Sequence, residues 1–129
     1  MDYTVEFTGD RVILTTAGEV DVADVERLVR ELVADPRFTP GLPILADHTQ
    51  LEAASLTSAE TRQIGLIFVD FGARIGPSPL SVVVRDAVTF GLVRMAATYA
   101  AAAPLKAKVF YSRAEAEAWL AERAGLSTS

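Results

Sequence analysis

The sequence contains no cysteine, and His48 is its one histidine. Without cysteine, disulfide bonds, thiolate metal sites and cysteine nucleophiles are all excluded. A single histidine also removes most metal sites and most acid–base mechanisms. We therefore expect no metal and no cofactor, and a binding domain rather than an enzyme.

The common catalytic and nucleotide-binding motifs are missing as well. The sequence has no G-x-G-x-x-G, G-x-x-x-x-G-K-[ST], G-x-S-x-G or H-E-x-x-H segment. Such segments supply the amides, hydroxyls and imidazoles that bind phosphate, attack acyl groups or hold zinc. Their absence agrees with a non-enzymatic domain.

Basic residues are in the minority. Twelve Lys and Arg stand against 17 Asp and Glu, which gives a net charge of -5 and a pI near 4.8. A nucleic-acid-binding domain needs a basic face to neutralise phosphates, so this class of partner is disfavoured. The chain also lacks a polybasic segment that would attract it to an anionic membrane.

Long hydrophobic runs are absent too. The longest weakly charged stretch, 87–103, is interrupted by Arg94 and is too short to span a bilayer. The first six residues carry acids where a signal peptide would carry Lys or Arg. We expect no transmembrane segment and a cytoplasmic protein.

The residues that are present indicate one globular domain. Half of the 129 residues are apolar and 22% are charged, which is typical of a compact domain of this length. Glycine is common just after the last residue of a helix, so Gly125 is predicted to end the last helix. The sequence therefore predicts a single domain over 1–125, followed by a flexible C-terminal tail at 126–129.

Hydrophobic periodicity predicts alternating strands and helices. An N-terminal hairpin turns at Gly9–Asp10, and strands are expected at 3–8, 12–14, 43–46, 80–84 and 106–111. Capping residues and amphipathic spacing predict helices at 22–35, 58–71, 89–103 and 113–124. The resulting order, β-β-α-β-α-β-α-β-α, predicts an α/β fold with a mixed, mainly parallel five-stranded sheet and four helices.

Polar side chains follow the predicted parallel strands. They are Asp47, His48 and Thr49 after the third strand, Arg85 and Asp86 after the fourth, and Thr57 and Ser58 at a helix start. Ligands of open α/β sheets gather at the carboxyl ends of the strands, so a polar binding loop is predicted here. The same residues also fit structural roles: the aspartates as loop caps, His48 as an exposed strand-end residue and Thr57 as a helix cap.

The two middle helices carry more apolar residues than one face can hide. In the first of them, Leu66 and Val69 lie opposite the stripe that includes Phe68. In the second, Phe90 and Val93 form a second apolar face. The second apolar face of each helix could be covered by packing of the two helices on each other, by the partner in a homodimer, or by an apolar ligand. The sequence leaves all three possibilities open.

Three segments resemble the STAS domain family: GDRVILTTAGEVDVADVERLVREL, PILADHTQLE and KAKVFYSRAEAEAWLAE. The similarity extends over nearly the whole chain. It is greatest to one branch of the family, which resembles the anti-sigma-factor antagonists and is linked with CRAL-TRIO lipid-binding domains. It implies the same strand and helix order, and a regulatory domain that acts by binding other proteins.

The resemblance also implies a phosphorylation site. In anti-sigma-factor antagonists a serine in a D-S-S-G motif at the start of a helix is phosphorylated. When the sequences are aligned on Asp47, this chain has Ser55-Leu56-Thr57-Ser58 there, so Thr57 takes the phosphoacceptor position, without the acid and the glycine of the motif.

Two functional hypotheses follow. The first is a STAS-like regulatory domain that docks on a protein partner or forms a homodimer. Its surface would comprise the loop after the third strand and the apolar middle helices. The second is a carrier that holds an apolar, lipid-like ligand between those helices.

Overall fold

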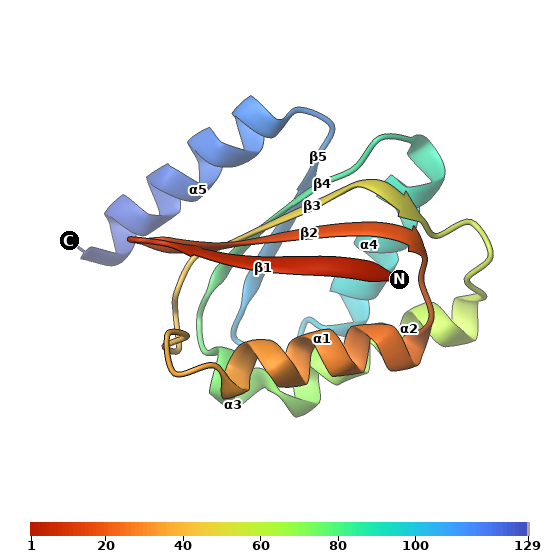
Figure 1. Ribbon diagram of the computed structural model, residues 1–129, viewed down its shortest axis with the longest axis horizontal. Coiled ribbons are helices and arrows are strands. Elements are labelled where there is room, and N and C mark those ends of the chain that lie inside the picture. The colour runs from red at the N-terminus through yellow and green to blue at the C-terminus, as the bar shows by residue number, and fades with distance from the viewer. Residues whose placement is uncertain (129) are drawn as a thin grey trace.

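A five-stranded sheet forms the centre of the computed structural model, which describes residues 1–128 (Figure 1). Its strands lie side by side in chain order: β1 (Asp2–Thr8), β2 (Arg11–Glu19), β3 (Ile44–Glu52), β4 (Pro79–Val83) and β5 (Lys106–Phe110). The hairpin strands β1 and β2 pair antiparallel, and every later pair is parallel. The predicted α/β class with a mixed, mainly parallel sheet is confirmed.

The helices lie on both faces of this sheet. They are α1 (Val22–Ala34), α2 (Ser58–Asp70), α3 (Gly72–Ile75), α4 (Ala87–Tyr99) and α5 (Arg113–Thr128). Since each parallel strand joins the next one along the sheet, right-handed crossovers place α1, α2 and α4 on one face. The last helix, α5, covers the opposite face against β3, β4 and β5 (Figure 1).

Three helix predictions need correction. The structure has five helices within the described residues rather than four, because the short α3 follows α2 directly. The helix expected at 89–103 spans 87–99, since Asp86 accepts a hydrogen bond from the Thr89 amide (2.8 Å) and starts it earlier. The last helix continues past Gly125 to Thr128, because one glycine costs a helix only about 1 kcal/mol. Ser129, in the predicted tail, lies outside the described residues.

The third strand is longer than the sequence predicted. It was expected to end before Asp47, but β3 continues to Glu52 because the long strand β2 offers it a partner as far as Glu19. The pairing shifts register between Thr15 and Ala17, where β3 has one extra residue. Such a bulge redirects the neighbouring side chains. Asp47, His48 and Thr49 therefore lie within a strand, and no loop begins there.

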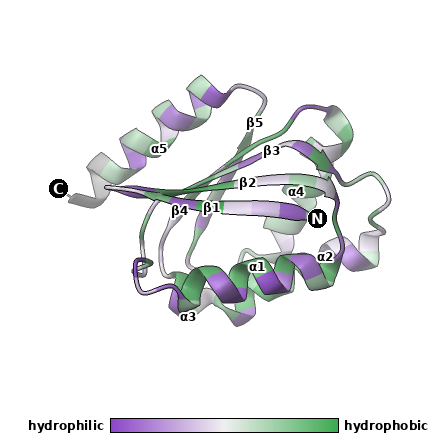
Figure 2. Cartoon of the chain, in the orientation of Figure 1, coloured by the Kyte–Doolittle hydropathy of each residue, from purple (hydrophilic) through white to green (hydrophobic). Residues whose placement is uncertain are grey.

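The two faces of the sheet have separate cores. Residues such as Val12, Ile44 and Val82 pack toward α1, α2 and α4, while Leu45 and Val83 pack toward α5. This follows from the two-residue period of a strand. In Figure 2 the ribbons of α1 and α5 alternate between hydrophobic and hydrophilic colours, the pattern of helices with one buried side. No helix among residues 1–128 is long and apolar enough to cross a membrane.

Helices α2 and α4 approach each other closely at Gly65. A Cβ atom added there would lie 2.6 Å from the Ala96 carbonyl oxygen and 2.6 Å from Tyr99 Cβ. A side chain at this position is therefore incompatible with the observed spacing of the two helices. Mutual packing thus covers part of the apolar surface that the sequence left unassigned.

We expect Gly65→Ala to lower the free energy of unfolding by about 1–3 kcal/mol, because the added methyl overpacks this contact. Gly91→Ala is the matched control: it lies in α4, and a Cβ atom added there would meet nothing within 4 Å. Removing a helical glycine there should stabilise the protein by about 0.5–1 kcal/mol. Urea unfolding of both variants measures the difference, and equal effects would contradict the close contact.

Candidate functional site

Asp47 forms a polar cluster on the α5 side of the sheet. Its Oδ1 accepts hydrogen bonds from the Thr49 amide (3.0 Å) and hydroxyl (2.7 Å), and its Oδ2 lies 3.3 Å from Arg113 Nη1. Burial raises the pKa of Asp47, but the bonds from Thr49 and the charge of Arg113 outweigh it and lower the pKa. Asp47 is therefore an anion held in place by its own neighbours.

A small apolar surface lies where β4 and β5 end. The rings of Phe90 and Tyr111 stack with centroids 4.8 Å apart. Val88 is 57% exposed and Tyr111 is 56% exposed. We call Val88, Phe90 and Tyr111 the edge patch. Arg85 and Asp86 are exposed beside it in the sequence, and the hydrogen bond from Thr89 lowers the pKa of Asp86.

Thr57 and Ser58 lie at the start of α2. The Thr57 hydroxyl accepts a hydrogen bond from the Glu60 amide (3.1 Å), and Glu60 accepts one from the Thr57 amide (3.0 Å). Within residues 1–128, no hydrogen bond or ion pair joins Thr57 or Ser58 to the other predicted site residues. The cleft beside them is lined by five acids, Asp2, Glu19, Asp21, Asp24 and Glu60. In this structure Thr57 serves as a helix cap.

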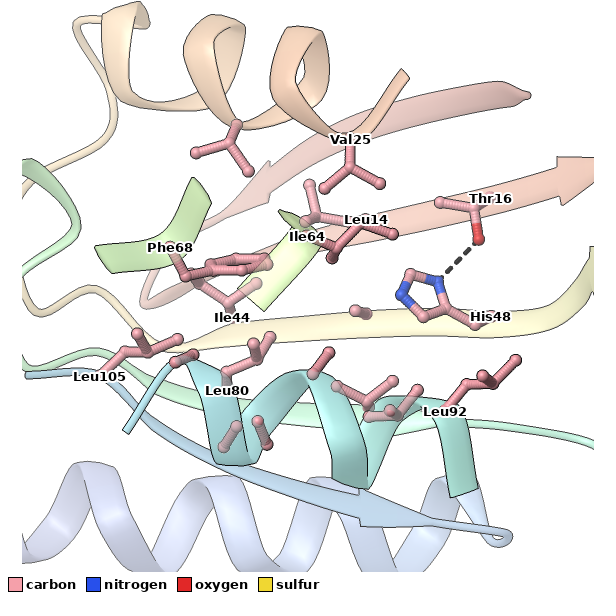
Figure 3. Close-up of a pocket in the computed structure, with 18 of the residues that line it drawn as sticks. Leu14, Thr16, Val25, Ile44, His48, Ile64, Phe68, Leu80, Leu92 and Leu105 are labelled. Atoms are coloured by element: carbon pink, nitrogen blue, oxygen red, sulfur yellow. Dashed lines mark hydrogen bonds between the residues drawn. The ribbon is translucent and has the colours of Figure 1, made fainter. Parts of the chain in front are cut away.

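A pocket of about 570 Å³, which we call the cavity, is lined mainly by the sheet and the helices α1, α2 and α4 (Figure 3), and at β5 it continues round the edge of the sheet to Trp119 and Arg123 of α5. Small-molecule pockets in proteins commonly measure about 300–1,000 Å³. Its walls are mainly aliphatic, with Leu14, Ile44 and Leu80 from the strands and Ile64 and Leu92 from the helices. Such walls offer a water molecule few hydrogen-bond partners, so the best-matched occupant is apolar.

His48 and Thr16 provide polar atoms in this apolar wall. His48 Nδ1 and Thr16 Oγ1 are hydrogen-bonded at 2.7 Å, and Figure 3 shows the pair toward the Leu92 end of the cavity. Burial lowers the pKa of His48 to about 4, although the charge of Asp47 opposes the shift. The imidazole is therefore neutral at pH 7. The prediction of an exposed strand-end histidine is wrong, because the longer β3 carries His48 along the inner face of the sheet.

Helix α4 covers the cavity loosely. Of its thirteen residues, all within the described part of the chain, Thr89 alone is buried. Val93, Ala96 and Ala97 line the cavity and remain partly exposed. The small alanine side chains leave space beneath the helix that larger residues would fill.

Of the four apolar site predictions, Leu66 lies apart, while Val69, Phe90 and Val93 all pack against the main core. Val93 lines the cavity, and Phe90 belongs to the edge patch. Leu66 is 41% exposed on the outer side of α2, and Val69 packs against the main core. Sequence reasoning missed Thr16 and Tyr111, since a threonine and a tyrosine in strand-like segments look ordinary. The alanine-rich run after Val93 was the available signal for the cavity.

Comparison with known proteins identifies the fold. An uncharacterized protein of the DUF3478 family from Shewanella loihica, with a SpoIIAA-like fold, matches with a TM-score of 0.58 and 18% identity over 92% of each chain. An anti-sigma factor antagonist from Mycobacterium paratuberculosis matches with a TM-score of 0.60 and 19% identity over 93% of each chain. No family model and no curated protein matches the sequence. The chain therefore has a SpoIIAA-like, or STAS-like, fold, as the resemblance implied.

The lowered pKa of His48 predicts that the stability of the protein depends on pH. The unfolded chain binds a proton at His48 near pH 6.5, while the folded chain binds it only near pH 4, so falling pH favours unfolding across that range. We expect a loss of about 2 kcal/mol between pH 7 and pH 5. The His48→Gln variant, which cannot titrate there, should lack this loss.

Urea unfolding at several pH values measures the difference between the two proteins. Because His48 is the chain's one histidine, NMR of its imidazole protons also reports the pKa directly. A midpoint near 6.5 would contradict the burial of this side chain.

Proposed function

We propose that this chain is a non-enzymatic regulatory domain that docks on a protein partner through the edge patch. The observation that carries the proposal is the stacking of the partly exposed Phe90 on Tyr111, which is 56% exposed, with the exposed Val88 two residues before Phe90 in the sequence. Aromatic residues and arginines are enriched where proteins bind each other, and Arg85 is exposed close by in the sequence.

The condition of the titratable groups supports binding over catalysis. Asp86 caps α4, Asp47 is bonded to Thr49 and Arg113, and the neutral His48 is bonded to Thr16. Each group is thus engaged in holding the structure, and none of the three is poised for proton transfer. One of the structures that share the fold is called an anti-sigma factor antagonist, a name that describes action on another protein.

In-cell photo-crosslinking tests the docking surface. A benzophenone amino acid at position 111 should yield one discrete adduct, and Val88→Glu in the same chain should remove most of it, because truncating or charging an interface centre costs about 2 kcal/mol or more. The mass of the adduct distinguishes a second copy of the chain from another protein. The matched control carries the probe at Glu122, which is exposed on α5.

The same adduct from both probe positions, or none from position 111, would refute the docking surface. An adduct that persists unchanged with Val88→Glu would place the partner elsewhere on the chain.

The cavity favours a second candidate function, the carriage of an apolar ligand. Its position between the sheet and α2 and α4 agrees with the second hypothesis from the sequence. A ligand in the cavity would contact α4. The edge patch includes residues in the first turn of the same helix, so the ligand and the edge patch would share this helix. Carriage and docking are therefore compatible.

A matched pair of alanine substitutions tests whether the cavity is usable. Ala46 is buried and lines the cavity, whereas Ala116 is buried in the α5 face. We expect Ala46→Leu to change stability little and to abolish adducts of apolar molecules in native mass spectra, because the leucine fills the volume. Ala116→Leu should cost about 1–3 kcal/mol through overpacking. Equal destabilisation by the two variants would argue against a ligand-sized cavity.

A further inference from the structure

One nitrogen of the His48 ring has no hydrogen-bond partner in the cavity. Nδ1 is hydrogen-bonded to Thr16 Oγ1 at 2.7 Å, and within residues 1–128 no hydrogen bond is found at Nε2. In Figure 3 this second nitrogen points away from Thr16 and into the cavity. A neutral imidazole has one donor and one acceptor nitrogen, so half of its hydrogen-bonding capacity is unused here.

The contacts of Thr16 assign the proton of the ring. Thr16 Oγ1 lies 3.3 Å from the Asp47 carbonyl oxygen as well as 2.7 Å from His48 Nδ1. The hydroxyl has one proton and the carbonyl can only accept, so both contacts are hydrogen bonds when Thr16 donates to Asp47 and Nδ1 donates to Thr16. Nε2 is then unprotonated, and it presents an acceptor to the cavity.

The surroundings of Nε2 favour a donor that is supplied by a ligand. On the side to which Nε2 points, Figure 3 shows the aliphatic side chains of Leu14, Ile44 and Ile64. Thr61, another polar residue of the wall, already donates its hydroxyl to the Thr57 carbonyl (2.9 Å). A water molecule bound in a protein interior needs about two to four polar partners, which aliphatic side chains do not provide. A charged donor would lose its hydration without gaining a counter-charge.

We propose that the cavity binds an uncharged hydrocarbon alcohol, whose hydroxyl donates a hydrogen bond to His48 Nε2. This inference rests on the second candidate function, the carriage of an apolar ligand, and adds the group that the ligand carries and the residue that recognises it. The hydrocarbon part contacts the aliphatic wall, and the hydroxyl satisfies the nitrogen that the protein itself leaves without a partner.

Three probes of equal size separate the possible head groups. They are 1-undecanol, 2-undecanone and 1-chloroundecane, which have the same number of non-hydrogen atoms. The alcohol donates and accepts hydrogen bonds, the ketone accepts only, and the chloride does neither to a useful extent. The full chain, freed of bound lipid by unfolding and refolding, would be titrated with each probe in a calorimeter at pH 7.

We expect 1-undecanol to bind about five-fold or more tightly than 2-undecanone, because the ketone leaves both its own oxygen and Nε2 unsatisfied. His48→Phe keeps a ring and removes Nε2, while Thr16 retains its bond to Asp47. This variant should weaken the alcohol about five-fold or more and change the affinity of the chloride little.

Ser81→Ala is the matched control. Ser81 is buried beside Leu45 on the α5 face of the same sheet, and its hydroxyl has no hydrogen-bond partner among the described residues. The substitution therefore removes a buried polar group without breaking a contact, and it should leave the affinities of all three probes unchanged.

NMR of the ring gives a second measurement that needs no variant. His48 is the chain's one histidine, so ¹⁵N-labelled histidine gives signals from Nδ1 and Nε2 alone. The free protein should show an unprotonated Nε2. Addition of 1-undecanol should shift the Nε2 signal more than the Nδ1 signal, and 1-chloroundecane should not.

The outcomes separate this inference from the function on which it rests. Equal binding of alcohol and ketone, or an Nε2 signal that 1-undecanol does not move, would overturn the role of His48 and retain the cavity as an apolar site. Equal weakening of the alcohol by His48→Phe and Ser81→Ala would also overturn that role. No binding of any of the three probes would overturn ligand carriage itself.

Discussion

The order of the strands determines most of this structure. Because β2, β3, β4 and β5 follow one another across the sheet, three right-handed crossovers have to place α1, α2 and α4 on the same face. The opposite face is left to α5 alone. The first face must therefore accommodate three helices side by side. The close approach of α2 and α4 at Gly65 agrees with that arrangement.

The two faces of the sheet are packed differently. Leu45, Val83, Ala116 and Leu120 form a compact core under α5. On the other face, α4 contributes alanines where a filled core would need larger side chains, and the hydrogen-bonded pair Thr16 and His48 is among the polar residues in the aliphatic wall. A neutral, hydrogen-bonded histidine is compatible with such a wall, whereas a charged one is not. The chemistry of His48 is thus a product of its place on β3.

Much of the architecture could be predicted from the sequence because it depends on local signals. The hairpin turn at Gly9, the cap at Thr57 and the two-residue period of the strands are each readable within a few residues. The candidate site depends on distant partners. His48 turns inward because β2 is long enough to pair with β3 beyond Asp47, and Phe90 meets Tyr111 across 21 positions of sequence. Neither relation has a local signature, so the predicted polar loop after the third strand did not form.

The position of β5 at the edge of the sheet has a consequence for assembly. An edge strand presents unpaired backbone groups, and a strand from another chain could extend the sheet there. An added strand would lie between α4 on one face of the sheet and α5 on the other. The exposed Lys106 and Lys108 place two positive charges along this edge, and such charges protect a domain from growing edge to edge.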